Sequence, residues 1–156
     1  MKTKINSISI LIPLLVSFCF SQNNWPPKFE DYLIDSIYKG KIADPDFSTN
    51  KEAKRFRTVI RYKVRTAREQ KQINFAGHFI ICEWGCGSPC QENVIVDATN
   101  GHIYDGTNTC WGYETKPNSK LLIANADTSN HMKDVCAPAY YLWEGKKLIE
   151  LTKPTK

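Results

Sequence analysis

The sequence has little of what marks several large classes of chain. Glycine and proline contribute eight residues each to the 156, and there is no internal repeat or low-complexity tract. This composition excludes collagen-like, coiled-coil and disordered chains. Six cysteines are too few for a disulfide-dense miniature scaffold. Charged residues make up 24% and hydrophobic residues 42% of the chain, as in ordinary globular proteins, and the length fits one domain.

Long apolar runs are also missing, and the longest one lies at the start of the chain. Residues 8–20 form this run, which is shorter than the roughly 20 apolar residues of a membrane-spanning helix. Two lysines precede the run and small residues, including Ser21, follow it, which is typical of a secretory signal peptide. We therefore expect residues 1–21 to be removed. Residues 22–156 would then form a single compact domain without a transmembrane span.

A lipid anchor on Cys19 is the alternative to cleavage after Ser21. Phe18 stands directly before that cysteine, where the lipoprotein peptidase requires a small residue. This argues against lipid anchoring on Cys19. We expect a protein that is secreted or periplasmic after signal-peptide cleavage.

Two segments near the start of the expected domain have apolar residues at helical spacing. The first covers residues 29–38 and is followed by Gly40, a natural helix stop. The second covers residues 50–68, with Thr49 or Asn50 as a candidate cap. Its apolar stripe consists of Ala53, Phe56, Ile60, Val64 and Ala67.

After residue 72 the pattern changes from helical to strand-like. The expected strands are 76–84, 92–98, 102–104, 120–124, 140–143 and 147–151. Asn100-Gly101 favours a tight hairpin turn, and no long helical segment separates the strands. The sequence therefore predicts an α+β fold, with two N-terminal helices followed by an antiparallel meander of five or six strands. Residues 105–119 are expected to form a loop.

Three short motifs resemble those of a known family. The segment 74–78 is N-F-A-G-H, the loop 84–90 is W-G-C-G-S-P-C, and residues 94–97 are V-I-V-D. They are similar to the N-F-A-G-H-Y segment, W-G-C-G-x-x-C loop and I-V-D-x-x-T-G hairpin of a family of small exported bacterial proteins. The likeness covers about residues 42–152, although Phe79 stands where the family has tyrosine. The resemblance implies export and one compact domain, and it assigns no catalytic residue.

Five cysteines remain after residue 21, and export would place them in an oxidising compartment. An odd number leaves one thiol unpaired. Cys82 lies within an apolar run, so we expect it to be a buried free thiol. The other four lie in loops or flanking segments, and the expected bridges are Cys86–Cys90 and Cys110–Cys136.

The cysteines and the histidine and aspartate near them leave an enzyme open as the alternative function. Cys86 could act as a nucleophile, with His78 as its base and Asp97 orienting the histidine. Cys86 and Cys90 could instead bind zinc together with two histidines. The C-x3-C spacing does not match the C-x-x-C of thioredoxin-type chemistry, and no second closely spaced pair completes a zinc site. We therefore expect no catalytic residue, no metal and no cofactor.

Positive charge is concentrated in the second expected helix. Between Lys51 and Lys71, nine basic residues face two acidic ones, a net charge of +7 over 21 residues. One interpretation is a solvated helix face without a binding role. The functional interpretation is a contact for an anionic partner. Docking of the apolar stripe would turn most of these cations outward. The expected binding residues are Arg57, Arg61, Arg65, Arg68 and, on the next loop, Trp84.

These features favour an exported, non-enzymatic module that binds an anionic component or protein of the cell envelope. One form of this function is an inhibitor or immunity protein against a wall-degrading enzyme. Nucleic acid is not expected as a partner, because export removes it from contact and no recognition motif is present. The alternative is a cysteine- or metal-dependent envelope hydrolase that uses Cys86, His78 and Asp97.

Overall fold

The computed structural model describes residues 25–126 and 136–155. The expected signal peptide, with Cys19, lies outside these residues. Two 3-10 turns, at Phe29–Tyr32 and Glu52–Phe56, precede the helix α1, Arg57–Gln70. The strands are β1 (Phe79–Gly87), β2 (Cys90–Asp97), β3 (Ile103–Asp105), β4 (Tyr113–Thr115), β5 (Leu121–Ala124), β6 (Ala139–Trp143) and β7 (Leu148–Leu151).

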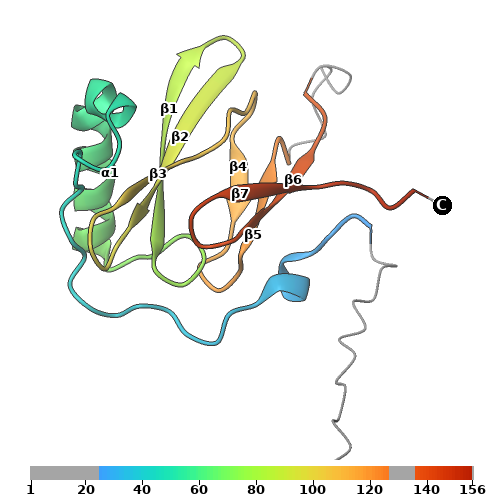
Figure 1. The fold of residues 1–156 in the computed structure, drawn as a ribbon, viewed down its shortest axis with the longest axis horizontal. Coiled ribbons are helices and arrows are strands. Elements are labelled where there is room, and N and C mark those ends of the chain that lie inside the picture. Colours follow the sequence, from blue (N-terminus) through green and yellow to red (C-terminus); the bar gives the residue numbers. More distant parts are fainter. Residues whose placement is uncertain (1–24, 127–135, 156) are drawn as a thin grey trace, which may run out of the picture.

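The strands form two antiparallel sheets, with the order β1-β2-β3 in one and β4-β5-β6-β7 in the other. The α+β class is confirmed, but the single meander is replaced by these two sheets. Figure 1 shows α1, the first sheet and the second sheet in succession. The strand β4 falls within residues 105–119, which were expected to be a loop. Three residues are too few to show a strand periodicity in the sequence.

The first sheet is buried on both faces, which explains the continuous apolar runs in β1 and β2. One face packs against Ile60 and Val64 of α1. Its residues are Ile80, Cys82, Val94 and Val96. The opposite face packs against Leu122 and Trp143 of the second sheet. Its residues are Phe79, Ile81 and Ile95. Alternate residues of each strand therefore serve two separate cores.

The helix expected over residues 29–38 is wrong. Only the 3-10 turn Phe29–Tyr32 forms there. The chain then runs extended past both sheets toward α1 (Figure 1). The backbone N–H of Ile34 donates to the carbonyl of Asn118 at 3.0 Å, and that of Tyr38 donates to Gly77 at 2.7 Å. A ten-residue helix is marginal by itself, so hydrogen bonds to distant segments replace those of a helix.

The second expected helix is confirmed, with shifted bounds. The side chain of Asn50 accepts a hydrogen bond from the N–H of Ala53 at 3.0 Å, as expected of a cap. A 3-10 turn then leads into α1, which is followed by Lys71 in the left-handed conformation, φ 52°. The buried residues of α1, Ile60 and Val64, belong to the predicted apolar stripe.

The turn between β2 and β3 holds the segment that runs beside α1. Ala43 N–H donates to the carbonyl of Ala98, and Asp46 N–H donates to that of Gly101, both at 2.8 Å. Gly101 has a φ of +83°, and a Cβ atom there would overlap the carbonyl oxygen of Asp44. Glycine therefore satisfies both the backbone conformation and the close approach. These contacts fix Asp44 near the helix.

Candidate binding site

The predicted disulfide pairing is confirmed. Cys86 bonds to Cys90 with a Cα–Cα distance of 5.1 Å, and Cys110 bonds to Cys136 with a distance of 6.0 Å. Both distances lie in the usual disulfide range. Cys82 is free and buried, as expected. The first bridge closes the tip of the β1–β2 hairpin, and the second ties the segment before β4 to the segment before β6.

The three residues of the hydrolase alternative are not brought together. His78 Nε2 lies 4.0 Å from Asp97 Oδ2, where β1 begins and β2 ends. Cys86 lies eight residues further along the extended β1, about 26 Å away by strand geometry. It is also bonded to Cys90, so it carries no free thiolate. Neither His78 nor Asp97 is therefore within reach of Cys86 as its base.

Asp97 acts in the turn that follows β2. Its carboxylate accepts hydrogen bonds from the N–H and hydroxyl of Thr99 and from the amide of Asn100, at 2.6–3.0 Å. This is the arrangement of an Asx-type turn. Within the described ranges, no group of three or more His, Cys, Asp or Glu side chains could hold a metal ion.

The thiol of Cys82 is expected to be unreactive in the folded protein. Burial raises its pKa to about 12, so almost no thiolate exists at neutral pH. Native residues 22–156 should therefore not react with a disulfide thiol reagent, and one thiol per chain should react after denaturation. Absorbance titration measures this. Rapid labelling of the native protein, above all at Cys86, would contradict the assignment and favour the enzyme.

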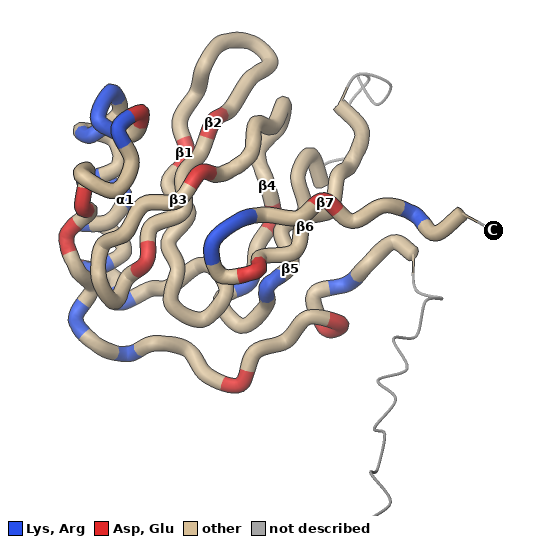
Figure 2. The backbone as a smooth tube through the Cα atoms, viewed as in Figure 1, with Lys and Arg blue, Asp and Glu red and all other residues tan. Residues whose placement is uncertain are grey.

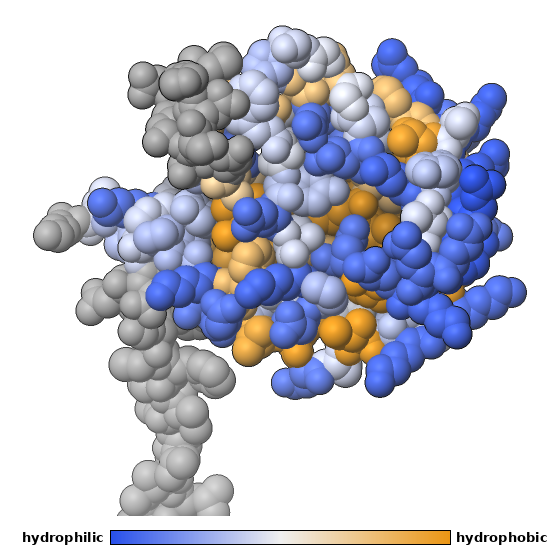
Figure 3. Space-filling model, turned by 180° about the vertical axis from the view of Figure 1, so that it is seen from behind, coloured by the Kyte–Doolittle hydropathy of each residue, from blue (hydrophilic) through white to orange (hydrophobic). Residues whose placement is uncertain are grey.

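Four arginines follow one line along α1. Their spacing of four, four and three residues places them in a stripe beside the buried Ile60 and Val64. We call them the arginine row: Arg57, Arg61, Arg65 and Arg68. Figure 2 shows basic residues recurring along α1. Figure 3 shows hydrophilic side chains covering the side of the molecule on which α1 lies.

Arg68 is the member of the row whose charge is already compensated. Its Nε donates to the carbonyl of Ile42 at 3.2 Å, and its terminal nitrogen donates to Asp44 Oδ1 at 2.6 Å. This hydrogen bond, with the charge of Arg68, lowers the pKa of the Asp44 carboxyl. Arg68 therefore links α1 to the extended segment before it, and it is not the free outward cation that the sequence suggested.

The other three arginines remain available. In the part of the chain that the structure describes, Arg57 and Arg61 form no ion pair, and no ion pair joins the row to either sheet. Arg65 lies 3.9 Å from Glu69, and the two side chains are 64% and 68% exposed. An exposed pair at that distance contributes less than about 1 kcal/mol. Each of these arginines can thus still bind an anion.

Aromatic rings support two of these arginines. The guanidinium carbon of Arg61 lies 5.3 Å from the centre of the Phe47 ring, and that of Arg65 lies 5.7 Å from the Tyr62 ring. A ring contact restricts a guanidinium without using its N–H donors. These donors can form paired hydrogen bonds to a phosphate or carboxylate.

A groove of about 690 Å³ separates α1 from the Asp44–Pro45 segment. Arg61, Arg65 and Arg68 line it together with Tyr62. We call it the arginine groove. Its one carboxylate, Asp44, is held by Arg68, so the remaining guanidinium groups face a space that favours a negatively charged group.

Trp84 has a structural role that the sequence did not indicate. Its ring stacks on Phe56 at 4.3 Å between centroids and 21° between planes. Its indole N–H donates to Glu92 at 3.1 Å. Since both the face and the polar atom are engaged, the residue joins β1 to the start of α1. Trp84 also lines a small cavity of about 180 Å³ between the second 3-10 turn and β2, so a binding role for it stays a prediction.

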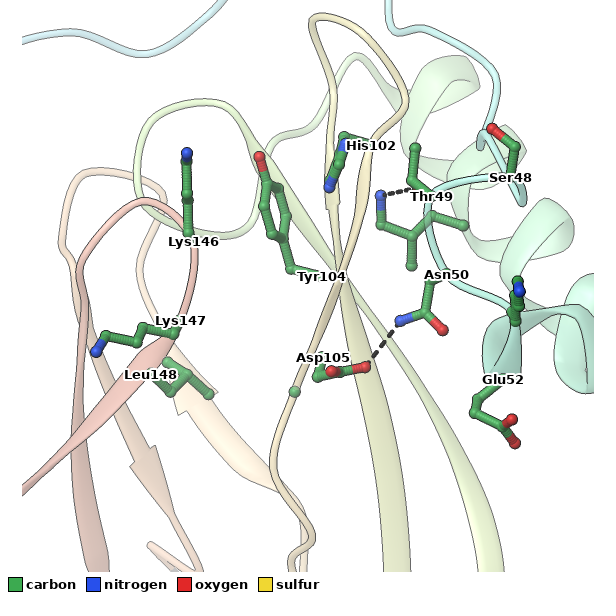
Figure 4. A pocket seen from close by; sticks show the side chains of 13 residues that line it. Ser48, Thr49, Asn50, Glu52, His102, Tyr104, Asp105, Lys146, Lys147 and Leu148 are labelled. Atoms are coloured by element: carbon green, nitrogen blue, oxygen red, sulfur yellow. Dashed lines mark hydrogen bonds between the residues drawn. The ribbon is translucent and has the colours of Figure 1, made fainter.

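The sequence did not predict the cleft beside Tyr104. It measures about 770 Å³ and is formed by the loop before the second 3-10 turn, β3 and the β6–β7 turn. Figure 4 shows Tyr104 and Lys146 pointing toward the same opening, with His102 beside them. Asn50 donates to Asp105 at 2.8 Å on its floor. The cleft carries both signs of charge, and its residues come from three distant segments that share no motif.

No family model, curated protein or solved structure matches this chain. Among the described residues, no helix combines the length and apolar character needed to cross a bilayer. The possible chemistry of the site therefore follows from its geometry. That geometry offers a surface for anions at α1, together with a disulfide where the alternative needs a nucleophile.

Proposed function

We propose that the protein is an exported, non-enzymatic module that binds an anionic partner of the cell envelope through its arginine row. The observation that carries the proposal is the absence, within the described residues, of any ion pair between the arginine row and the sheets. Uncompensated cations on a helix create a positive potential that attracts anions and orients them before contact. Arg61 and Arg65 are the central binding residues.

Export is the second part of the proposal. Residues 1–21 act as a signal peptide, and the domain works as a secreted or periplasmic protein. The two disulfides support this placement, because such bonds persist in oxidising compartments. The motifs shared with small exported bacterial proteins point the same way. The bonded state of Cys86 weighs against the hydrolase alternative.

Binding to a polyanion that has no hydrocarbon part tests the proposal. Inorganic polyphosphate is expected to bind residues 22–156 at low salt, and uncharged dextran is not. Titration calorimetry measures both. The affinity should fall steadily as sodium chloride is added, because salt screens exposed charges over about 8–10 Å at physiological strength. Equal binding of both polymers, or no binding of polyphosphate at low salt, would refute the proposal.

A further inference from the structure

A second groove, of about 700 Å³, opens at the C-terminal end of α1. It lies between that end of the helix and the extended segment that replaces the first expected helix. Its floor is formed by Ile37, Tyr38, Ile42 and Ile73. Its rim is formed by Lys39, Lys41, Lys71 and Arg68. We call it the lysine-rimmed groove.

The floor of the lysine-rimmed groove is apolar. Ile37 is 41% exposed, whereas Ile42 and Ile73 are buried at the bottom. The hydroxyl of Tyr38 donates to the carbonyl of Lys41 at 3.1 Å, so the floor offers only the body of this ring. On the face seen in Figure 3, patches of apolar surface lie between hydrophilic side chains. An apolar floor of this size with a few charged groups is typical of a small-molecule site.

The rim carries positive charge without matching acids. In the described ranges, Lys39, Lys41 and Lys71 are exposed and form no ion pair. The acids near this end of α1 are Asp44, which is held by Arg68, and Glu69, which lies 3.9 Å from Arg65. Arg68 also lines the arginine groove, so the two grooves meet at this residue. The positive rim is therefore complementary to an anionic group, and the apolar floor is complementary to a hydrocarbon.

We propose that the lysine-rimmed groove binds a single-chain amphiphile with an anionic headgroup. The chain lies against Ile37 and Tyr38, and the lysines of the rim hold the headgroup. The inference rests on the proposed function for the sign of the ligand's charge, and it adds the hydrocarbon part. Burying one methylene group raises affinity up to about fourfold, so chain length should control binding strongly.

Alkyl phosphates below their micelle concentration provide the probe. Dodecyl phosphate should bind residues 22–156 at least tenfold more tightly than octyl phosphate, and dodecyl maltoside, which is uncharged, should bind weakly. Titration calorimetry measures all three. Equal affinities for the two phosphates would overturn the inference. Equal affinities for dodecyl phosphate and dodecyl maltoside would overturn it too.

Two variants locate the binding. Ile37→Asn keeps the charge and should lower the affinity for dodecyl phosphate about tenfold, while Leu33→Asn, at a 56% exposed leucine outside the groove, should not. The double variant Lys39→Glu/Lys41→Glu should weaken dodecyl phosphate binding, whereas the control double variant Lys146→Glu/Lys147→Glu should not.

Unchanged binding of dodecyl phosphate in both Ile37→Asn and Lys39→Glu/Lys41→Glu would refute the inference. So would a dimer of the native protein that Ile37→Asn dissociates, since the groove would then hold a second copy.

The outcome with polyphosphate separates the two proposals. Ile37→Asn should leave polyphosphate binding unchanged, because the arginine row remains intact. If polyphosphate binds but the alkyl chain adds no affinity, the inference about this groove fails and the proposed function stands. If polyphosphate does not bind, the proposed function fails, whatever the amphiphile does.

Discussion

Replacing Arg61 and Arg65 by glutamate is expected to lower the affinity for inorganic polyphosphate about a hundredfold at low salt. A cation near an anionic surface contributes about 1 kcal/mol to the binding free energy. Replacing it by an anion also adds electrostatic repulsion of similar size. Both side chains are exposed, so the free energy of unfolding should change by less than about 0.5 kcal/mol. Calorimetry measures the affinity, and urea denaturation measures the stability.

A matched pair of substitutions separates the arginine row from the overall charge. Lys146→Glu and Lys147→Glu change the net charge by the same amount, but they lie in the β6–β7 turn, outside the arginine groove. They should weaken polyphosphate binding far less. At 1 M salt, where charges are screened over about 3 Å, the arginine variant and the native protein should bind alike. Equal losses in the two double variants would contradict a role for the arginine row.

Replacing Trp143 by alanine is expected to lower the free energy of unfolding by about 3–5 kcal/mol, the usual cost of removing a large buried aromatic side chain. Trp143 is 2% exposed and lies between the two sheets. Its ring centre is 6.1, 5.0 and 5.4 Å from those of Phe75, Phe79 and Tyr104. The substitution would open a cavity where both sheets meet. Guanidinium denaturation measures the loss.

Trp143→Phe should be clearly less harmful than Trp143→Ala. The indole N–H of Trp143 is buried and has no hydrogen-bond acceptor among the described residues, which is itself unfavourable. Phenylalanine removes this donor and retains most of the aromatic contact. If phenylalanine and alanine destabilise the protein equally, packing of the ring between the sheets is not what holds them together.

The parts of the fold that the sequence predicted correctly are those with a clear local period. The stripe that includes Ile60 and Val64 repeats at helical spacing, and the apolar runs of β1 and β2 are long enough to identify. Residues 29–38 show the same helical spacing, but backbone hydrogen bonds to residues that are 39 to 88 positions away determine their conformation. Single-segment periodicity contains no information about such distant partners.

The candidate site divides in the same way. The disulfides followed from the oxidising compartment and loop positions, and the arginine row followed from its spacing along one helix. That Arg68 is held by Ile42 and Asp44 could not be predicted, since these residues are 26 and 24 positions away. The cleft beside Tyr104 was missed for the same reason, because it forms only when β3 and the β6–β7 turn come together.

Nuclear magnetic resonance titration of nitrogen-15-labelled residues 22–156 with inorganic polyphosphate tests the central claim most directly. If the arginine row is the binding surface, the largest amide and guanidinium shift changes will fall on Arg57, Arg61 and Arg65, and they will vanish at high salt. Largest changes in the Trp84–Cys90 loop or the β6–β7 turn, with α1 unperturbed, would contradict the account.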